Sequence, residues 1–290
     1  MITPPAERHD DLPTRPLRIA AAQAPVVRGD IAANAAQAAA LIRRAAAEGA
    51  RLVVFAEKFL TGYEAELISS DPLRYAVTAD DPRLAPITTA CRESGTIAVV
   101  GAVTRAADGL RVSALVVDAT GTVAACYAKQ HLFDAEVHHY LPGTAGCTLE
   151  VDGWRLGLGV CYDSGFPEHA RAAALDGCHA YLVGALFSVG GGEQQVRVWF
   201  PARALDNTVY TLLANHVGHT GGWNTCGGSA VWGPDGRLLA QAAPEGTDLA
   251  VADLDPAQLR RVRADLRMLT EIAGRDAAVA AGPRNRHALS

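Results

Sequence analysis

Three side chains that could form one reactive site each come directly after an apolar run of the sequence. They are Glu57 after 52–56, Lys129 after 123–128 and Cys161 after 157–160. A thiol can attack a carbonyl carbon, a carboxylate can take the thiol proton, and a cation can stabilise the oxyanion that forms. Because sites in open α/β sheets form at the carboxyl ends of strands, we expect these three side chains to converge.

The surroundings of Cys161 favour a reactive thiol. A buried strand is predicted before it, and Pro167 and Glu168 mark the start of a helix shortly after it. Backbone N–H groups at a helix start stabilise a thiolate or an oxyanion. Taken singly, a buried cysteine is more often an inert core residue, and Glu57 and Lys129 could be solvated charges. The prediction of a site therefore depends on the three residues occurring together.

The composition indicates a globular chain with a large core. Of its 290 residues, 49% are hydrophobic, which suits one large domain better than two small ones. A net charge of −5 and a pI near 6.0 argue against nucleic-acid and anionic-membrane partners. No apolar run reaches the length of a membrane span, and residues 1–16 lack the apolar region of a signal peptide.

The cysteines and histidines predict neither disulfides nor a metal site. Six cysteines are scattered without a Cys-x-x-Cys pair, which is typical of reduced thiols in a cytoplasmic protein. Those assigned to packing are Cys91, Cys126, Cys147, Cys178 and Cys226. His131, His138 and His139 lie close together without zinc-ligand spacing. Residues 190–192 are expected to form a loop without nucleotide-binding spacing, so no cofactor is expected.

Strand and helix patterns alternate along the chain. Predicted strands cover 17–23, 51–56, 97–103, 112–118, 123–128, 154–160, 180–183, 209–215, 229–232 and 238–241. Predicted helices cover 31–48, 84–93, 168–176 and 196–206, and a last helix begins at Pro256. Turn signals at 119–121 and 234–236 predict two hairpins.

This order of elements predicts an α/β fold. Both halves repeat a strand–helix plan, so we expect two mixed sheets packed face to face with helices on their outer faces. The result is a four-layer α-β-β-α sandwich. We expect a flexible leader over 1–16, one domain over 17–272, and a mobile or partner-bound tail over 273–290.

Four segments resemble motifs of the nitrilase superfamily of carbon–nitrogen hydrolases, and the resemblance runs from 17 to 263. The segments are Cys-Tyr-Asp-x-x-Phe-Pro-Glu at 161–168, Lys-x-His-Leu-Phe at 129–133, Ala-Arg-Ala-x-x-Asn at 202–207 and Gly-Ser-Ala at 228–230. In that family a Glu, a Lys and a Cys act in this order, and Glu57, Lys129 and Cys161 match them.

The resemblance implies hydrolysis of an amide through an acyl-enzyme. Cys161 would attack, Glu57 would act as general base and acid, and Lys129 with the backbone N–H of Tyr162 would stabilise the oxyanion. Glu136 matches a second family glutamate, which orients the lysine. We expect Asp163 to brace the turn after the nucleophile rather than to react.

Departures from the family pattern bear on the substrate. Ala56 replaces a common proline, and Gly165 stands where relatives acting on dicarboxylic monoamides have an arginine that pairs with a carboxylate. The segment 184–188 replaces a Pro-Thr-Ala type of turn, and its apolar side chains are expected to line the acyl pocket. We therefore expect a small, neutral or partly apolar amide. The expected substrate-binding residues are Tyr63, His131, Ala185 and Phe187, with His131 positioning the lysine loop.

Other functions remain open at this point. An N-carbamoyl amine or a nitrile could be the substrate, because the same three residues serve those reactions in the family. A protein of another class, a catalytically idle subunit that binds partners, is the further alternative, although a scaffold has no physical need of a buried carboxylate, cation and thiol. Relatives usually assemble, so a homodimer or a higher homo-oligomer is expected.

Overall fold

The first large sheet has a parallel centre. A computed structural model describes residues 11–273 and 284–289, and in it six strands follow the order β14-β1-β2-β3-β4-β5. Their bounds are β1 (Leu17–Gln23), β2 (Leu52–Val54), β3 (Ile97–Ala106), β4 (Gly109–Val117), β5 (Val123–Ala128) and β14 (Asp248–Leu254). β1, β2 and β3 run parallel, and β4 and β14 are antiparallel to their neighbours. β5 therefore ends at the same edge as β2.

The second sheet repeats this plan with seven strands, in the order β13-β12-β9-β8-β7-β6-β15. Their bounds are β6 (Gly146–Val151), β7 (Trp154–Val160), β8 (Ala180–Ala185), β9 (Tyr210–Asn215), β12 (Ala230–Trp232), β13 (Leu238–Gln241) and β15 (Arg284–Ala288). β7, β8 and β9 are parallel. Both hairpins expected from turn signals are present, as β4–β5 and β12–β13.

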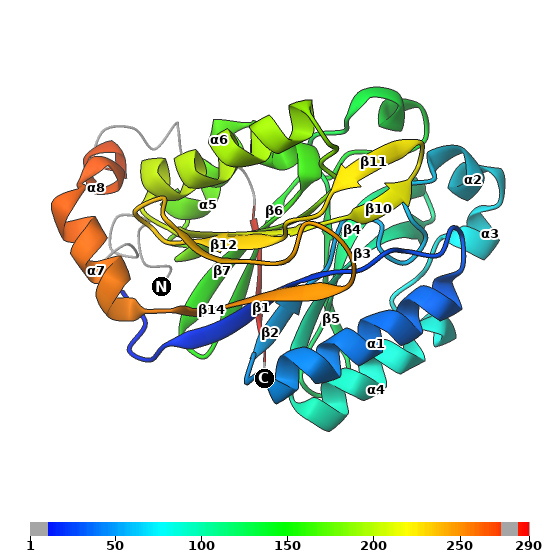
Figure 1. Ribbon diagram of the computed structural model, residues 1–290, viewed down its shortest axis with the longest axis horizontal. Coiled ribbons are helices and arrows are strands. Elements are labelled where there is room, and N and C mark those ends of the chain that lie inside the picture. Colours follow the sequence, from blue (N-terminus) through cyan, green and yellow to red (C-terminus); the bar gives the residue numbers. More distant parts are fainter. Residues whose placement is uncertain (1–10, 274–283, 290) are drawn as a thin grey trace.

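Helices cover the outer face of each sheet, so the expected four-layer order is confirmed (Figure 1). α1 (Ile31–Ala47) and α4 (Ala85–Ser94) cover the first sheet, and α5 (Pro167–Leu175) and α6 (Gly191–Asn207) cover the second. The other α-helices among the described residues are α2 (Ala65–Ser70), α3 (Pro72–Tyr75), α7 (Pro256–Asp265) and α8 (Met268–Ala273). No helix among the described residues is both long enough and apolar enough to cross a membrane.

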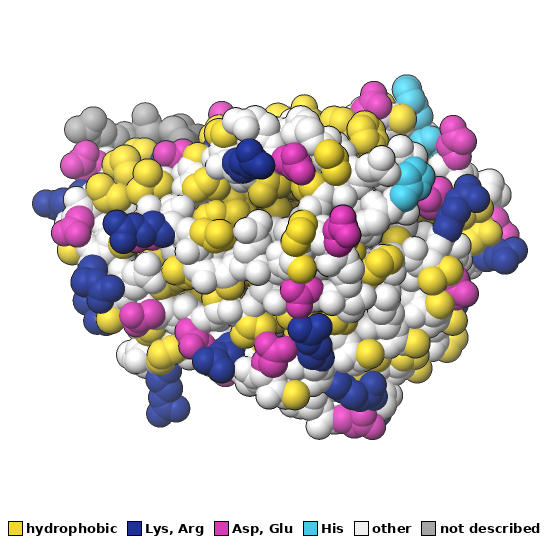
Figure 2. Space-filling view, in the orientation of Figure 1, with side chains coloured by type: hydrophobic (Ala, Val, Ile, Leu, Met, Phe, Trp, Pro, Cys, Tyr) yellow, Lys and Arg dark blue, Asp and Glu magenta, His cyan; other side chains and the backbone are white. Residues whose placement is uncertain are grey.

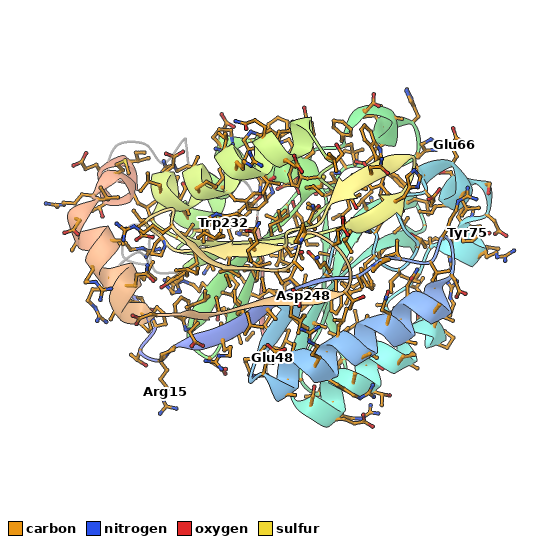
Figure 3. All side chains as sticks on the ribbon, in the orientation of Figure 1. Arg15, Glu48, Glu66, Tyr75, Trp232 and Asp248 are labelled. Atoms are coloured by element: carbon orange, nitrogen blue, oxygen red, sulfur yellow. The ribbon has the colours of Figure 1, made fainter. Side chains whose placement is uncertain are left out.

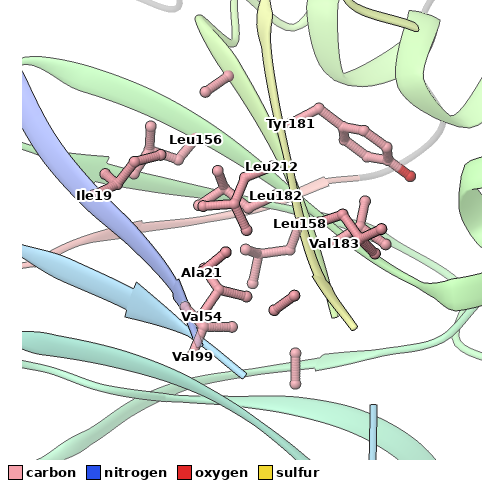
Figure 4. Packing of buried hydrophobic residues seen from close by; sticks show 14 of the residues in the cluster. Ile19, Ala21, Val54, Val99, Leu156, Leu158, Tyr181, Leu182, Val183 and Leu212 are labelled. Carbon is pink, nitrogen blue, oxygen red and sulfur yellow. The ribbon is translucent and has the colours of Figure 1, made fainter. Parts of the chain in front are cut away.

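The main core lies between the two sheets (Figure 4). Ile19, Val54 and Val99 of the first sheet face leucines of the second, and all are at most 3% exposed. The facing leucines are Leu156, Leu158, Leu182 and Leu212. Burial of this apolar surface holds the sheets together and fixes how their strand ends meet.

Aromatic packing and surface ion pairs secure the helical layers. Trp232 of β12 stacks on Phe200 of α6 with ring centroids 5.2 Å apart (Figure 3). On the opposite side, Arg44 of α1 bonds both Glu48 and Asp248 and so links this helix to β14. On the face that Figure 2 shows, basic and acidic side chains are interspersed rather than gathered by sign.

Several elements differ from the sequence-based expectation. The strands β6, β14 and β15, the ribbon β10 (Val217–Thr220) with β11 (Trp223–Cys226), and helices α2, α3 and α8 were not expected. The helix at Pro256 is therefore not the last. Residues 190–192 were expected to be a loop, but α6 begins at Gly191. A Cβ at Gly192 would lie 3.1 Å from the backbone of Phe187, so glycine lets the first turn of α6 pack against that backbone.

The chain ends also differ from the expected leader and tail. Residues 1–10, 274–283 and 290 lie outside the described residues. Within the predicted leader, the backbone carbonyl of Arg15 accepts a hydrogen bond from the Trp154 indole at 2.9 Å, and Asp11 pairs with Arg155. Within the predicted tail, Arg284–Ala288 forms β15 and pairs in parallel with β6. These segments of the leader and tail are therefore packed on the second sheet.

The inter-sheet core can be tested with Leu182→Ala. Because Leu182 is 1% exposed between the sheets, we expect this change to lower the free energy of unfolding by about 2–5 kcal/mol in chemical denaturation. Leu73→Ala is the matched control, since Leu73 is 73% exposed, and it should change the value by less than about 0.5 kcal/mol. Equal effects of the two changes would contradict the core assignment.

Candidate active site

Glu57 is held at the end of β2 by close backbone contacts from both sheets. A Cβ on Gly101 of β3 would lie 2.0 Å from the carbonyl oxygen of Ala56, and one on Gly184 of β8 would lie 2.4 Å from that of Phe55. Only glycine admits such approaches. The segment that carries Glu57 is therefore clamped where the two sheets meet.

Lys129 bridges two buried carboxylates. Its Nζ lies 2.7 Å from Glu57 Oε1 and 2.7 Å from Glu136 Oε2. Glu136 belongs to the 3₁₀ helix η3 (Asp134–His138) and also accepts a hydrogen bond from the Phe133 N–H at 3.0 Å. The structure thus brings three of the predicted residues into direct contact.

Cys161 begins the 3₁₀ helix η4 (Cys161–Gly165), directly after β7. Its φ of 46° is in the left-handed region that residues other than glycine rarely adopt. Its thiol donates to the carbonyl of Leu186 at 3.6 Å, and its own carbonyl accepts from the Ser164 hydroxyl at 2.7 Å. The strained turn presents the thiol at the end of the strand, where a substrate can reach it.

Asp163 ties the strand of Lys129 to the strand of Cys161. Its Oδ2 accepts from the Val160 N–H at 3.0 Å and from the Tyr127 hydroxyl at 2.7 Å. Its Oδ1 accepts from the His131 N–H at 2.9 Å and lies 2.9 Å from His131 Nδ1. Tyr127 and His131 flank Lys129, so this buried carboxylate fixes the lysine loop relative to the nucleophile, as expected for a brace.

His131, Asp163 and His169 also have ligand atoms within 4.8 Å of one another. Those atoms are already engaged, because His169 contacts the hydroxyls of Tyr127 and Tyr181 at 2.8 Å each and Asp163 accepts the bonds given above. Burial lowers the pKa of His169 to about 4, so its ring is neutral in this network. The hydrogen bonds account for the clustering of these three residues.

Burial controls the electrostatics of the site. It raises the pKa of Glu57. The charge of Lys129 acts to lower that pKa, and the charge of Glu136 acts to raise it further. Burial also raises the pKa of the Cys161 thiol, as does the charge of Glu57, while Lys129 opposes both. Burial acts to lower the pKa of Lys129, but the facing carboxylates keep that pKa above the usual value for a lysine. A single proton can therefore pass between thiol and carboxylate without leaving two anions together.

Glu57 has one oxygen free for that proton. Its Oε1 is bonded to Lys129, and its Oε2 is buried with no hydrogen-bond partner among the described residues. The Glu57 backbone carbonyl lies 2.6 Å from Nε2 of His216, whose pKa burial lowers to about 4. A neutral His216 can donate to that carbonyl and hold the backbone in place.

A pocket of about 230 Å³ opens over Cys161. Its lining contains no Asp, Glu, Lys, Arg or His side chain. It is formed by Tyr63, Phe133, Cys161, Tyr162, Leu186, Phe187, Ser188, Gly191, Gly192, Gln195, Trp199 and Trp223. The pocket therefore suits a small uncharged ligand with an apolar part.

Two of the four expected substrate-binding residues line this pocket, and two do not. Tyr63 and Phe187 are in the lining. Ala185 was expected there but is fully buried outside the lining, because alternation along β8 puts its side chain on the face of Tyr181, toward the helical layer, and not on the face of Leu182. His131 is also outside the lining, since its ring stacks on Phe166 with centroids 3.9 Å apart and bonds Asp163.

Sequence reasoning missed Lys58 and the two tryptophans of the pocket, Trp199 and Trp223. Lys58 is fully buried, and its Nζ lies 2.5 Å from Glu136 Oε1. A compositional signal could have found it, because Lys58 and Lys129 are the only lysines of the chain and the other 24 of its 26 basic residues are arginines. The tryptophans come from α6 and β11, where sequence patterns gave no sign of a pocket.

The chain is similar in sequence to known proteins. A model of the carbon-nitrogen hydrolase family matches residues 18–264. A hydrolase from Pseudomonas protegens is 33% identical over 260 residues, which cover 88% of each chain. The omega-amidase from Homo sapiens is 28% identical over 241 residues, covering 79% of this chain and 86% of the human protein.

Solved structures of an amidase also resemble this chain. The amidase from Nesterenkonia sp. AN1 has a TM-score of 0.75 and 32% identity, over 87% of this chain and 98% of the amidase. One of its structures holds butyramide, and another has the acetamide moiety of fluoroacetamide added covalently to the active-site cysteine.

The brace can be tested with Asp163→Asn. An amide nitrogen in place of an oxygen would face donors instead of accepting from them, so we expect the free energy of unfolding to fall by about 2–4 kcal/mol. Alkylation of Cys161 should change in rate as the turn shifts.

Asp152→Asn is the matched control, because Asp152 is exposed and, in the described part of the chain, its side chain pairs only with Arg51. It should alter stability by about 0.5 kcal/mol or less. Unchanged stability and an unchanged rate of Cys161 alkylation in Asp163→Asn would contradict the bracing role of Asp163.

Proposed function

The chain belongs to the carbon-nitrogen hydrolase family, and from this premise we propose that it hydrolyses small neutral amides through a thioester on Cys161. The observation that carries the proposal is the contact of Lys129 with both Glu57 and Glu136, at the end of strands that also present the thiol. A cation shared by two buried carboxylates beside a thiol supplies each group that acyl transfer needs.

In the first half-reaction, the Cys161 sulfur bonds to the amide carbonyl carbon while the thiol proton passes to Glu57 Oε2. Lys129 Nζ and the Tyr162 N–H stabilise the oxyanion that forms. Glu57 then gives the proton to the leaving nitrogen, the C–N bond breaks, and ammonia or an amine departs. The acyl group remains as a thioester on Cys161.

In the second half-reaction, Glu57 takes a proton from water and the resulting hydroxide attacks the thioester carbon. The C–S bond breaks, the thiolate recovers the proton from Glu57, and a carboxylic acid leaves. One carboxylate serves both half-reactions because burial raises its pKa toward the range in which it can both take and give a proton.

The pocket supports a neutral acyl group. A substrate carboxylate entering this lining would lose its hydration and meet no Arg, Lys or His side chain. Gly165 offers no charge, and a Cβ built there would lie 3.1 Å from the indole of Trp199. The butyramide held by the Nesterenkonia amidase is an amide of this kind. We therefore propose short, apolar primary amides as the substrate class.

Ammonia release tests the reaction. Cys161→Ala should lower it by about three orders of magnitude or more, and Glu57→Gln should lower it strongly by removing the base. Cys126→Ala, which changes an exposed cysteine, should keep the activity of the unchanged protein. In the unchanged protein Cys161 should alkylate faster than the other five cysteines, and equal alkylation rates would contradict the assignment.

A matched pair of amides tests the substrate class. Isocaproamide carries an isopropyl group where succinamate carries a carboxylate, so the two differ mainly in charge. We expect kcat/KM for isocaproamide to exceed that for succinamate by about tenfold or more, because the pocket offers that charge no partner. A preference for succinamate would overturn this class, and activity confined to nitriles or N-carbamoyl amines would move the chain to another reaction.

A further inference from the structure

Lys58 and Lys129 are the only lysines among the 290 residues, and both are fully buried against Glu136. Lys58 Nζ lies 2.5 Å from Glu136 Oε1, and Lys129 Nζ lies 2.7 Å from Glu136 Oε2. Every other basic side chain of the chain is an arginine or a histidine. The proposed mechanism uses Lys129 but assigns nothing to Lys58.

The surroundings of Lys58 suit an ammonium ion. Its Nζ lies 3.7 Å from the ring centroid of Tyr63 and 4.8 Å from that of Tyr140. The faces of both rings attract a cation, and the Tyr63 hydroxyl donates to the same Glu136 oxygen at 2.9 Å. Burial is the largest effect and lowers the pKa of Lys58 below its usual value; Lys129 acts in the same direction, whereas Glu136 and Glu57 act to raise that pKa. The contact with a carboxylate and two ring faces offsets part of the cost of burial.

The backbone brings Lys58 to this position. Adjacent side chains of an extended strand point to opposite faces, so Glu57 and Lys58 would not normally reach one cluster. Lys58 has a φ of 50°, in the left-handed region, and the chain turns there. Consecutive side chains thus enter the same cluster, one bonded to Lys129 and the other to Glu136.

The result is a chain of four charges of alternating sign. Glu57, Lys129, Glu136 and Lys58 follow one another in contact order, and two positive charges match two negative ones. Without Lys58 the set would carry a net negative charge beside the thiol. That charge would oppose formation of a thiolate and would let Glu136 compete with Glu57 for the Lys129 ammonium.

We propose that Lys58 is a positioning residue that stays protonated, occupies one oxygen of Glu136 and leaves the other for Lys129. Lys129 is then held between Glu136 and Glu57 at the place where the oxyanion forms. This inference rests on the proposed function for its kinetic consequences, whereas the protonation of Lys58 is a property of the protein itself.

Lys58→Met removes the charge and keeps a chain of similar length. We expect kcat to fall by about 10- to 100-fold and KM to stay within about twofold, because Lys58 supports the site without lining the pocket. Losing a positive charge favours the protonated form of Glu57, so the acidic limb of the kcat/KM profile should move to higher pH. The other titratable groups around Lys58 and its partners are Glu57, Lys129, Glu136, Tyr63, Tyr140, Cys161 and His216.

Arg43→Met is the matched control. Arg43 is exposed and pairs with Glu93 on the surface, so its loss also removes one positive charge but should leave the pH profile in place. A loss of activity in Lys58→Met without movement of the acidic limb, or an equal movement in Arg43→Met, would overturn the positioning role.

A spectroscopic measurement tests the proposal without turnover. Labelling the lysine Cε carbons with ¹³C should give two side-chain signals, one for each lysine, and both should have ammonium shifts at neutral pH. In Lys58→Met the remaining signal should move, because Lys129 loses its neighbour across Glu136. A signal with an amine shift in the unchanged protein would overturn the proposal.

The two failures can be told apart. If Cys161→Ala kept full activity, the proposed function would fail while both ¹³C signals could still report ammonium groups. If Cys161→Ala were inactive and one lysine were neutral, the hydrolase mechanism would stand and the role of Lys58 would fall.

Discussion

The need for charge balance in a space without water is the constraint on which the rest of this site depends. Glu57, Lys58, Lys129 and Glu136 are each at most 2% exposed, and removing one such ion from water costs several kcal/mol. They are tolerated together because each touches a partner of opposite sign. The same contacts that offset this cost fix the two carboxylates and the two ammonium groups relative to one another, so the charge balance and the alignment of these groups depend on the same geometry.

The two packed sheets fix the positions of these charged side chains. Glycines at 101 and 184 let strands of both sheets approach the backbone before and after Glu57. Asp163 joins the lysine loop to the nucleophile turn through hydrogen bonds to main-chain and side-chain donors. Because these supports lie in the inter-sheet core or beside it, the reactive groups are placed by the most rigid part of the fold, while the pocket wall comes from loops, α6 and β11.

Much of the fold and of the site could be predicted from the sequence, and each feature that was missed has a physical reason. Buried strands such as Leu17–Gln23 and Trp154–Val160 were found with their observed bounds, since continuous apolar runs mark parallel strands buried on both faces. The strand Arg284–Ala288 was missed because it is polar and its place depends on pairing with β6. Glu57, Lys129 and Glu136 meet as the motifs suggested. Ala185 did not reach the pocket, because strand alternation turned it toward the helical layer. Lys58 was overlooked because its burial follows from its own left-handed backbone conformation, which no local sequence pattern predicts.

The distribution of lysine has a consequence for the outer surface. Both lysine amines are enclosed, and the basic side chains that meet solvent are those of arginines and histidines; the guanidinium groups among them are poor nucleophiles because they stay protonated. Activated esters, aldehydes and other acylating compounds therefore find no lysine side chain to modify from outside. In the proposed mechanism, with its thioester on Cys161, the burial of both lysines therefore limits their stray acylation from outside.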